Sequence, residues 1–447
     1  MLSIKSSYTV KPASPTPNCR LWLSDSDQLE PYTHAPTIYF YRSPIGVSPS
    51  SAVETMRSSL SQALVQFYPL AGRLQWIDGT RLELDCNAMG VELLEAESEN
   101  RIDDFGDFRP TPEIRQLIPR VDYGLPINEI PLLLVQLTSF PCGGISIGVA
   151  ISHSVVDGKS AINFIGAWTK IARGEKPDPT PPFLDRTVLQ ASGPVVAPRF
   201  DHVEFDSLPH LIGRPDDKEE RAKETTVEMF KLTKEQVEKL KSKANEGRTK
   251  DSGRAYTRYE AIAGHVWRCA CKARAHEREQ LTKVRIIVDC RNRLNPPLPQ
   301  GYFGNAIVPT IATARSGDLM DQPLGYAAGK IREAVVKMTD EYVRSAIDFL
   351  RSQPDLMRFR TSFHSVGCSE GGFFGNPNLT ITSWLGLAIY EGDFGWGRPI
   401  YMGPGLIASD GKCSVLSGGE DGSLAIPLGL QVAHVDAFKE LFYEDIM

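Results

Sequence analysis

The sequence predicts an α/β protein built from two lobes of mixed sheet and helix that are joined by a long crossover segment. Both halves of the chain contain two kinds of segment. In some, apolar and polar residues alternate as in a β-strand, and in others apolar residues recur every three or four positions as in a helix. A stretch rich in proline from Pro177 onward, which closes with the charged run 216–224, separates the halves. We therefore place the first lobe at residues 1–187, the linker at 188–225 and the second lobe at 226–447.

The first half contains the clearest local patterns. Residues 37–41 are aromatic and β-branched, which predicts a strand. Apolar residues recur at helical spacing between residues 53 and 67, which predicts an amphipathic helix. Residues 131–138 and 144–151 read as the two strands of a hairpin, and a helix is expected from about residue 159 to 174.

The second half has the same mixed character. Thr233 is followed three residues later by Gln236, the spacing of a capping box, so a charged and solvent-facing helix is expected to begin there. Residues 284–288 and 379–384 are largely apolar and predict two strands.

Composition narrows the class of protein. The chain has 447 residues and a formal net charge of -6, which argues against a general binder of nucleic acid or anionic membranes. We find no signal-like run in residues 1–11 and no membrane-length apolar stretch. The eight cysteines are scattered, and only Cys269 and Cys271 are close, without partners for a zinc site. We expect free thiols, no metal, and a cytoplasmic protein that acts as a monomer.

One short motif is typical of serine hydrolases, but the secondary structure predicted around it does not suit a catalytic serine. Residues 144–148 satisfy the pattern G-x-S-x-G. That pattern serves catalysis only where the serine lies on a sharp turn between a strand and a helix. Ile145, Ile147 and Val149 alternate through the motif, so Ser146 is expected inside a strand. We reject it as a nucleophile.

His153 is the first strong candidate for chemistry. It opens the sequence His-Ser-Val-Val-Asp-Gly, between the predicted hairpin and the following helix. An imidazole titrates near neutral pH and can act as a general base without large tuning. Asp157, four residues on, is placed to orient the turn or the ring. Taken alone, the motif leaves a structural histidine and a catalytic one both open.

Two further segments carry unusual side chains. Residues 289–293 read Asp-Cys-Arg-Asn-Arg at the end of a predicted strand, where Asp289, Arg291 and Arg293 would share one face. They form either a surface ion cluster or a cationic partner for a buried carboxylate such as Asp157. Residues 393–397 read Asp-Phe-Gly-Trp-Gly, which predicts a tight turn with unusual backbone angles at its glycines.

Together these motifs resemble the paired signature of the plant BAHD acyltransferases. That family combines an HxxxDG motif, here residues 153–158, with a DFGWG motif, here residues 393–397. Segments 67–74, 264–268 and 302–305 resemble further family segments in the same order. The resemblance implies two chloramphenicol-acetyltransferase-like lobes with a channel between them. Acyl-CoA and acceptor would enter from opposite faces and meet at His153.

The resemblance also implies roles for individual residues. His153 would be the general base, with no covalent intermediate, and the Trp384 indole N–H is our candidate donor to the oxyanion. Asp157 would be structural and pair with Arg293 or Arg291. Asp393 would hold the turn at the lobe interface, and it is also retained as a catalytic candidate. The acyl-CoA thioester would be a co-substrate, with no permanently bound cofactor. The predicted contacts along the CoA channel are Tyr256, Thr257, Arg258, Asp289 and Arg291, with Thr382 and Ser383 beside the thioester.

Within the family, the chain resembles the hydroxycinnamoyl transferases. Residues 34–41 resemble their acyl-pocket strand, so His34, Thr37 and Tyr39 are expected to contact a coumaroyl, caffeoyl or feruloyl group. Residues 368–374 lack the arginine with which relatives grip shikimate or quinate and contain Glu370 instead. That segment resembles spermidine hydroxycinnamoyl transferases, which predicts N-acylation of spermidine. The alternatives are O-acylation of shikimate or quinate and a noncatalytic binding protein.

Overall fold

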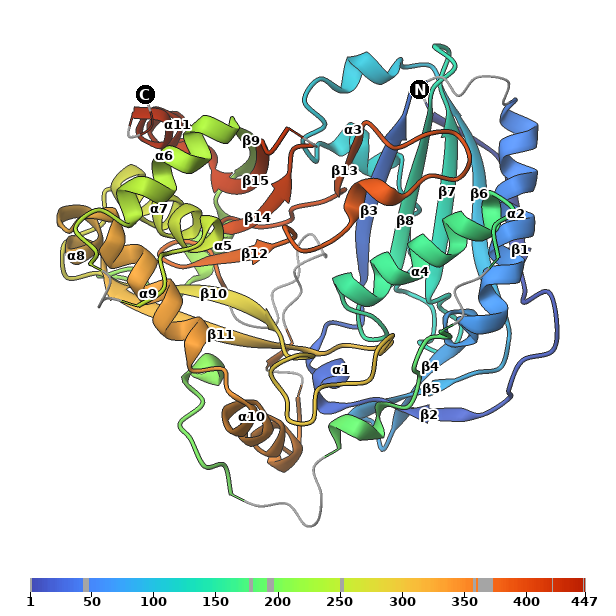
Figure 1. Cartoon of the computed structure of the whole chain (residues 1–447), viewed down its shortest axis with the longest axis horizontal. Helices are drawn as coiled ribbons and strands as arrows, with labels where there is room; N and C mark the ends of the chain where they lie inside the picture. Colours follow the sequence, from blue (N-terminus) through green and yellow to red (C-terminus); the bar gives the residue numbers. More distant parts are fainter. Residues whose placement is uncertain are drawn as a thin grey trace.

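The computed structural model describes residues 2–42, 48–176, 180–190, 197–249, 253–356, 359–360, 373–419, 421–444 and 446. It contains two six-stranded sheets and a smaller three-stranded sheet. Figure 1 shows the two large sheets in separate lobes that lie side by side, each with helices on one face. The predicted two-lobed α/β architecture is confirmed, and within the described residues no helix has the length and hydropathy needed to cross a bilayer.

The first large sheet has the strand order β1-β6-β7-β8-β3-β13. Its strands are β1 (Leu2–Val10), β6 (Val91–Ser98), β7 (Leu133–Ser139), β8 (Ile145–Ser152), β3 (His34–Tyr41) and β13 (Tyr401–Pro404). Helices α2 (Pro49–Gln66) and α4 (Gly158–Ala172) lie over one face of this sheet (Figure 1). The small sheet beside it pairs β2 (Arg20–Trp22), β5 (Arg81–Asp85) and β4 (Arg73–Ile77).

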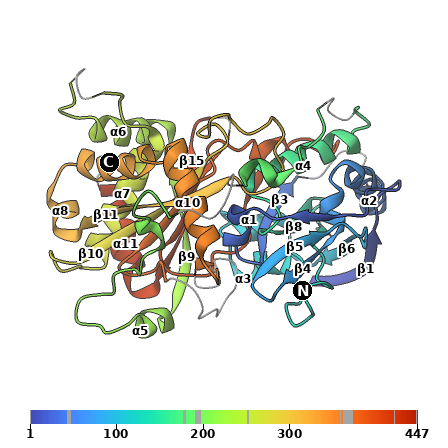
Figure 2. The same ribbon diagram turned by 90° about the horizontal axis from the view of Figure 1, so that it is seen from below.

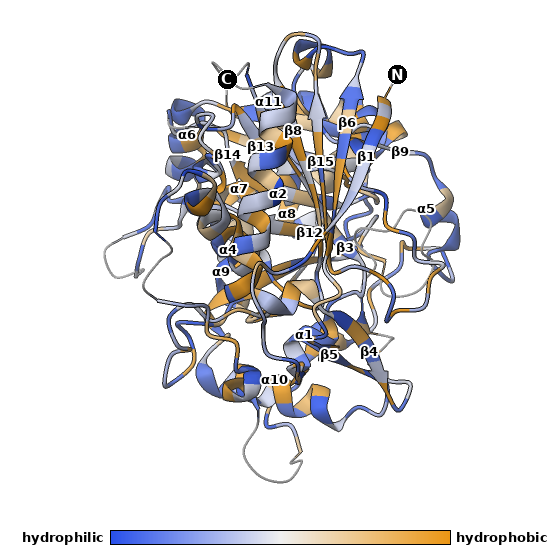
Figure 3. Ribbon diagram, turned by 90° about the vertical axis from the view of Figure 1, so that its right-hand side faces the viewer, coloured by the Kyte–Doolittle hydropathy of each residue, from blue (hydrophilic) through white to orange (hydrophobic). Residues whose placement is uncertain are grey.

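The second large sheet has the order β11-β10-β12-β14-β15-β9. Its strands are β11 (Ile307–Arg315), β10 (Leu281–Asp289), β12 (Leu379–Ser383), β14 (Lys412–Ser417), β15 (Leu424–Gln431) and β9 (Thr225–Leu232). Its helices are α6 (Lys234–Ala244), α7 (Arg258–Ala273), α8 (Ser316–Asp321), α9 (Leu324–Val336) and α11 (Val435–Glu444). Figure 3 shows α6 mostly hydrophilic, as its lysines and glutamates require, while hydrophobic residues follow the central strands.

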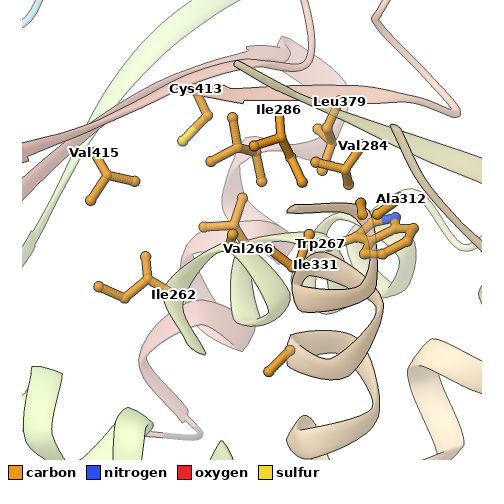
Figure 4. Packing of buried hydrophobic residues seen from close by; sticks show 14 of the residues in the cluster. Ile262, Val266, Trp267, Val284, Ile286, Ala312, Ile331, Leu379, Cys413 and Val415 are labelled. Atoms are coloured by element: carbon orange, nitrogen blue, oxygen red, sulfur yellow. The ribbon is translucent and has the colours of Figure 1, made fainter. Parts of the chain in front are cut away.

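One face of the second sheet carries the core of its lobe. Figure 4 shows Val266 and Trp267 of α7 packed beneath the apolar side chains of β10, β12 and β14. Because side chains alternate along a strand, the other residues of these three strands point away from the helices. That second face is turned toward the first lobe.

Three one-turn helices and the longer α10 lie around the lobes. They are α1 (Asp25–Leu29), α3 (Pro112–Gln116), α5 (Lys218–Ala222) and α10 (Asp340–Ser352). Figure 2 shows α1 of the first lobe beside α10 of the second. The side chain of Arg360 reaches across and donates to the carbonyl of Gln28 in α1 at 2.8 Å. The lobes therefore meet through polar contacts as well as apolar ones.

Strand β13 crosses between the lobes. It pairs antiparallel with β3, so that Tyr401 lies opposite Phe40 and Pro404 opposite Thr37. The predicted division of the chain is residues 1–187, 188–225 and 226–447. Strand β13 belongs to the last of these segments by sequence, but it lies in the sheet of the first lobe. The sequence of a four-residue strand does not predict which sheet the strand joins.

Most local predictions are confirmed. The strand and helix expected at residues 37–41 and 53–67 are β3 and α2, and the predicted hairpin is the antiparallel pair β7 and β8. Ser146 is buried inside β8, as its context required. Thr233 caps α6 with a full capping box. The described cysteines are free thiols, and Cys368 lies outside the described residues.

Candidate active site

A cavity of about 240 Å³ lies between the two lobes. One wall comes from the first lobe and is mainly apolar. It is formed by alternate residues of β3, β8 and β13 together with one side of α4: Ala35, Thr37, Tyr39, Val149, Ile151, Met402, Pro404, Ala161, Ile162 and Ile165. Thr37 lies opposite Val149 in β8 and opposite Pro404 in β13, so the three share one face of the sheet.

The opposite wall is the open face of the second sheet, and it is much more polar. Its residues alternate along β10, β12 and β14, with Trp384 directly after β12: Arg285, Ile287, Asp289, Thr380, Thr382, Trp384, Lys412 and Ser414. The hydroxyls of Thr382 and Ser414 lie 3.1 Å apart. One molecule in this cavity would therefore have an apolar surface on one side and hydroxyls and charges on the other.

His153 lies at the end of β8, where the chain leaves the apolar wall. It continues the alternation of Val149 and Ile151, so its side chain also faces the cavity. Its Nδ1 lies 3.2 Å from a carboxylate oxygen of Glu30, which is only 6% exposed. A carboxylate beside Nδ1 favours the tautomer with its proton there, which leaves Nε2 as the basic nitrogen. This arrangement suits a general base.

The backbone around His153 is fixed from three sides. Its N–H donates to the carbonyl of Thr33 at 3.1 Å, and its carbonyl accepts from the side-chain amide of Asn305 at 2.8 Å. The hydroxyl of Ser154 donates to the carbonyl of Pro31. Asn305 is itself bound to Asp27 of α1. Segments far apart in sequence therefore fix the backbone at His153.

Asp157 is buried and forms a two-point ion pair with Arg291. The guanidinium donates to the two carboxylate oxygens at 2.7 and 2.9 Å. The carboxylate also accepts from the backbone N–H groups of Ser160 and Ala306, the first of which caps α4. Burial would raise the pKa of this carboxyl, but the arginine and the N–H donors hold the pKa below its ordinary value. Asp157 thus joins the turn after His153 to the second lobe.

Of the two partners predicted for Asp157, Arg293 or Arg291, the structure shows Arg291, and the inclusion of Arg293 in this motif is wrong. Strand β10 ends at Asp289, so strand alternation does not extend to Arg293. Its guanidinium instead donates to the carbonyls of Val335 and Met338, at the end of α9. A cation is well placed there, because the last carbonyls of a helix lack partners within the helix.

Asp393 does not line the cavity, which corrects its inclusion among the catalytic candidates. One oxygen of its carboxylate accepts from the N–H groups of Gly395, Trp396 and Gly397 at 2.8 to 3.0 Å. Gly395 and Gly397 have φ values of 96° and 93°, a region that favours glycine and that the sequence predicted. Phe394 packs edge-on against Trp168 of α4. Asp393 therefore holds a turn that packs against the first lobe.

His34 is not a substrate contact, in contrast to the prediction. It points to the face of β3 opposite Thr37 and Tyr39, because residues of odd and even number alternate along the strand. Its ring nitrogens bind the hydroxyl of Tyr123 and the carbonyl of Pro131. Burial lowers the pKa of His34 to about 4, so the ring is neutral. Thr37 and Tyr39 do line the cavity, as expected from their face.

The predicted CoA contacts divide into two groups. The first lines the cavity and comprises Asp289, Arg291, Thr382 and Ser383. The second, Tyr256, Thr257 and Arg258, lies outside it, at the start of α7. Thr257 is the cap of that helix, and the Tyr256 ring lies between the guanidinium groups of Arg248 and Arg332. Glu370, the predicted acceptor contact, lies outside the described residues.

Three buried charged residues of the cavity were missed from the sequence: Glu30, Arg285 and Lys412. The sequence around Glu30 does not mark it as a site residue, because it precedes Pro31 in a short loop without a recognisable motif. Arg285 could have been found, because it interrupts the apolar run of β10, and Lys412 stands at the start of the apolar strand β14; charged side chains are seldom buried without a partner. They are only 4% and 8% exposed.

Comparison with known proteins agrees with this geometry. Residues 1–445 match the profile of the Transferase family. The chain is 55% identical over 449 residues to the hydroxycinnamoyl-CoA:piscidic acid hydroxycinnamoyltransferase of Actaea racemosa, covering 100% of both chains. It is 45% identical over 448 residues to the shikimate O-hydroxycinnamoyltransferase of Nicotiana tabacum, covering 99% of each.

Solved structures show the same fold at lower identity. Vinorine synthase superposes with a TM-score of 0.75 at 23% identity, over 100% of this chain and 98% of that one. F. graminearum TRI101 in complex with coenzyme A and T-2 mycotoxin gives 0.74 at 16% identity, over 94% and 97%. Because the family profile spans nearly the whole chain and close relatives match it from end to end, the chain belongs to the Transferase family, as a BAHD acyltransferase that uses an acyl-CoA co-substrate.

Proposed function

We propose that this enzyme transfers a hydroxycinnamoyl group from coenzyme A to a hydroxyl of a small acceptor, with His153 as the general base. The observation that carries the proposal is the position of His153, beside Glu30 and between an apolar and a polar wall. The apolar wall, with the Tyr39 ring, suits a planar aromatic acyl chain. The relatives named above as hydroxycinnamoyltransferases support this donor.

The reaction needs no covalent enzyme intermediate, because a thioester is already activated. The acceptor oxygen attacks the thioester carbonyl, and its proton passes to His153 as the new C–O bond forms. The tetrahedral oxyanion then collapses, the C–S bond breaks, and the CoA sulfur takes the proton back from the imidazolium. Glu30 stabilises the imidazolium between the two steps. Trp384, which lines the cavity, is our candidate oxyanion donor through its indole N–H.

We favour a hydroxyl acceptor over spermidine. Arg285 and Lys412 lie in the cavity wall, and their charges would repel a polyamine. The spermidine prediction depended on Glu370, which lies outside the described residues. Relatives at 55% and 45% identity are named for piscidic acid and for shikimate, and neither of the two is named for spermidine. The O-acylation considered as the alternative from sequence is therefore our proposal.

The test is an acceptor panel with purified enzyme. We expect p-coumaroyl-CoA to be consumed with shikimate, quinate, malate or tartrate, and the product to be an ester by mass analysis and by its lability to mild alkali. Spermidine should give no product above background. An amide of spermidine as the main product would contradict the proposal.

Replacing Glu30 by glutamine should lower kcat by about 10- to 100-fold, since the imidazolium formed during transfer loses a buried carboxylate 3.2 Å from its Nδ1. The KM for acyl-CoA should change little, because Glu30 acts on His153 and not on the thioester. Steady-state kinetics of Glu30→Gln and of Glu30→Asp, which keeps the charge, provide the measurement. If both variants retained full kcat, Glu30 would have no part in proton transfer.

A further inference from the structure

Two cysteines lie opposite each other at the end of the small sheet. Strands β2 and β5 pair antiparallel, with Arg20 opposite Asp85. Cys19 precedes Arg20 and Cys86 follows Asp85, so the same register places the two cysteines opposite each other. The N–H of Cys86 donates to the carbonyl of Cys19 at 2.9 Å. A hydrogen-bonded pair of this kind has its Cα atoms about 5.5 Å apart, within the span of about 4.4–6.8 Å that a disulfide requires.

The side chains of this pair are also in contact. Opposite residues of an antiparallel pair point to the same side of the sheet, and the Cys86 thiol hydrogen-bonds with Cys19. Cys86 belongs to the core of the first lobe, and Cys19 packs against that core from a partly exposed position. Both are free thiols. A bond between the two sulfurs therefore needs no rearrangement of the strands.

The two thiols differ in how readily they react. Cys86 is only 1% exposed, and burial, followed by the neighbouring Cys19, raises the pKa of its thiol above the ordinary value. A buried thiol of this kind reacts slowly with an oxidant from solvent, whereas the partly exposed Cys19 is within its reach. Cys19 is therefore the thiol that reacts first, and Cys86 is placed to react second.

A buried cation lies close to the pair. Arg186 is only 2% exposed, and its Nη1 has no hydrogen-bond partner among the residues that the structure describes. Its charge acts on Cys86 in the direction opposite to burial and favours the thiolate. Arg186 can therefore stabilise the negative charge that develops on the Cys86 sulfur as its proton leaves.

We propose that Cys19 and Cys86 are a site of reversible oxidation, at which a peroxide converts the two thiols to a disulfide. The Cys19 sulfur attacks one peroxide oxygen, the O–O bond breaks, and a sulfenic acid and one water form. The Cys86 sulfur then attacks the Cys19 sulfur, the S–O bond breaks, and the hydroxyl leaves as a second water with the Cys86 proton. Two thiols are oxidised by two electrons in total, and the peroxide is reduced to two waters.

The position of the pair indicates what the disulfide does. The chain runs from Cys19 through β2 and α1 to Glu30, and Figure 1 shows α1 close to the small sheet. The side chain of Gln28 in α1 donates to the carbonyl of Leu82 in β5 and accepts from its N–H. The disulfide would add a covalent bond at the start of this segment without moving it. We therefore expect oxidation to stabilise the first lobe and to leave catalysis unchanged, because a disulfide mainly restricts the unfolded chain.

The first test is a disulfide map of the full-length enzyme. The reduced protein is treated with hydrogen peroxide, its remaining thiols are alkylated, and its peptides are identified by mass spectrometry. We expect one linked pair of peptides that contains Cys19 and Cys86, lighter by two hydrogen atoms than the separate peptides, and its release by dithiothreitol. A Cys19 that stayed a thiol, reached the sulfinic acid or paired with another cysteine would overturn the proposal.

The second test measures stability and activity of the oxidised enzyme after the peroxide has been removed. The unaltered enzyme should melt a few degrees higher than its reduced form and should keep the kcat of that form. Cys19→Ser should lose the rise in melting temperature. Cys142→Ser, which removes another partly exposed thiol, is the matched control and should keep the rise. Equal melting temperatures of the oxidised and reduced unaltered enzyme, or a rise that persisted in Cys19→Ser, would contradict stabilisation by this disulfide.

Discussion

Replacing His153 by alanine is expected to lower kcat by about 10²- to 10⁴-fold, the usual contribution of a general base. The structure explains why no neighbour can replace it. The carboxylate of Glu30 lies 3.2 Å from the Nδ1 of His153, and Lys412 lies in the opposite wall of the cavity. Single-turnover kinetics with saturating p-coumaroyl-CoA and acceptor measure the effect on the chemical step alone.

The control for this variant is His210→Ala. His210 is an exposed histidine of the linker that does not line the cavity, so its loss should leave kcat unchanged. Both variants should keep the melting temperature of the unaltered enzyme within a few degrees. A His153→Ala enzyme with kcat close to that of the control would disprove general-base catalysis by His153.

The largest effect on stability is expected from Asp157→Asn. The substitution keeps the shape of the side chain but leaves the Arg291 cation buried without its carboxylate. Breaking a buried ion pair in this way destabilises a protein by about 3–5 kcal/mol. Thermal unfolding followed by circular dichroism should show a clearly lower melting temperature. Activity should fall as well, because Asp157 fixes the turn that begins at His153.

Asp321→Asn provides the comparison for Asp157→Asn. Asp321 pairs with Arg278 on the surface, where both side chains are about half exposed or more. Exposed pairs of this kind contribute about 0–1 kcal/mol, so the melting temperature should hardly change. If Asp157→Asn melted at the same temperature as Asp321→Asn, the buried pair would not join the lobes energetically.

Local features of this fold were predictable because their signals lie within a few residues. The strand at β10 follows from its apolar run, and the start of α6 follows from Thr233 and Gln236. The rejection of Ser146 as a nucleophile followed from the alternation around it. In each case the periodicity of side chains decides the outcome, and it can be read from one segment alone.

The candidate site was only half predictable, because its residues meet through tertiary contacts. Glu30 and His153 are brought together by the hydrogen bonds that join Pro31 and Thr33 to Ser154 and His153, and no pattern near Glu30 indicates this. His34 was assigned to the wrong face, although the alternation of side chains along β3 separates His34 from Thr37 and Tyr39 and could have been read from the sequence. Arg291 and Arg293 could not be distinguished without knowing that β10 ends at Asp289.

The position of β13 has a consequence for how the enzyme forms in the cell. Met402 and Pro404 of this strand complete the cavity wall next to Tyr39 and Thr37, yet they are synthesised long after β3, once most strands of the second sheet have been made. The first sheet cannot be finished on the ribosome when its own lobe emerges, because the edge of β3 must wait for β13. Until then that edge is exposed and able to pair with other chains. Shortening the chain before residue 401 should therefore yield aggregates and not a soluble first lobe.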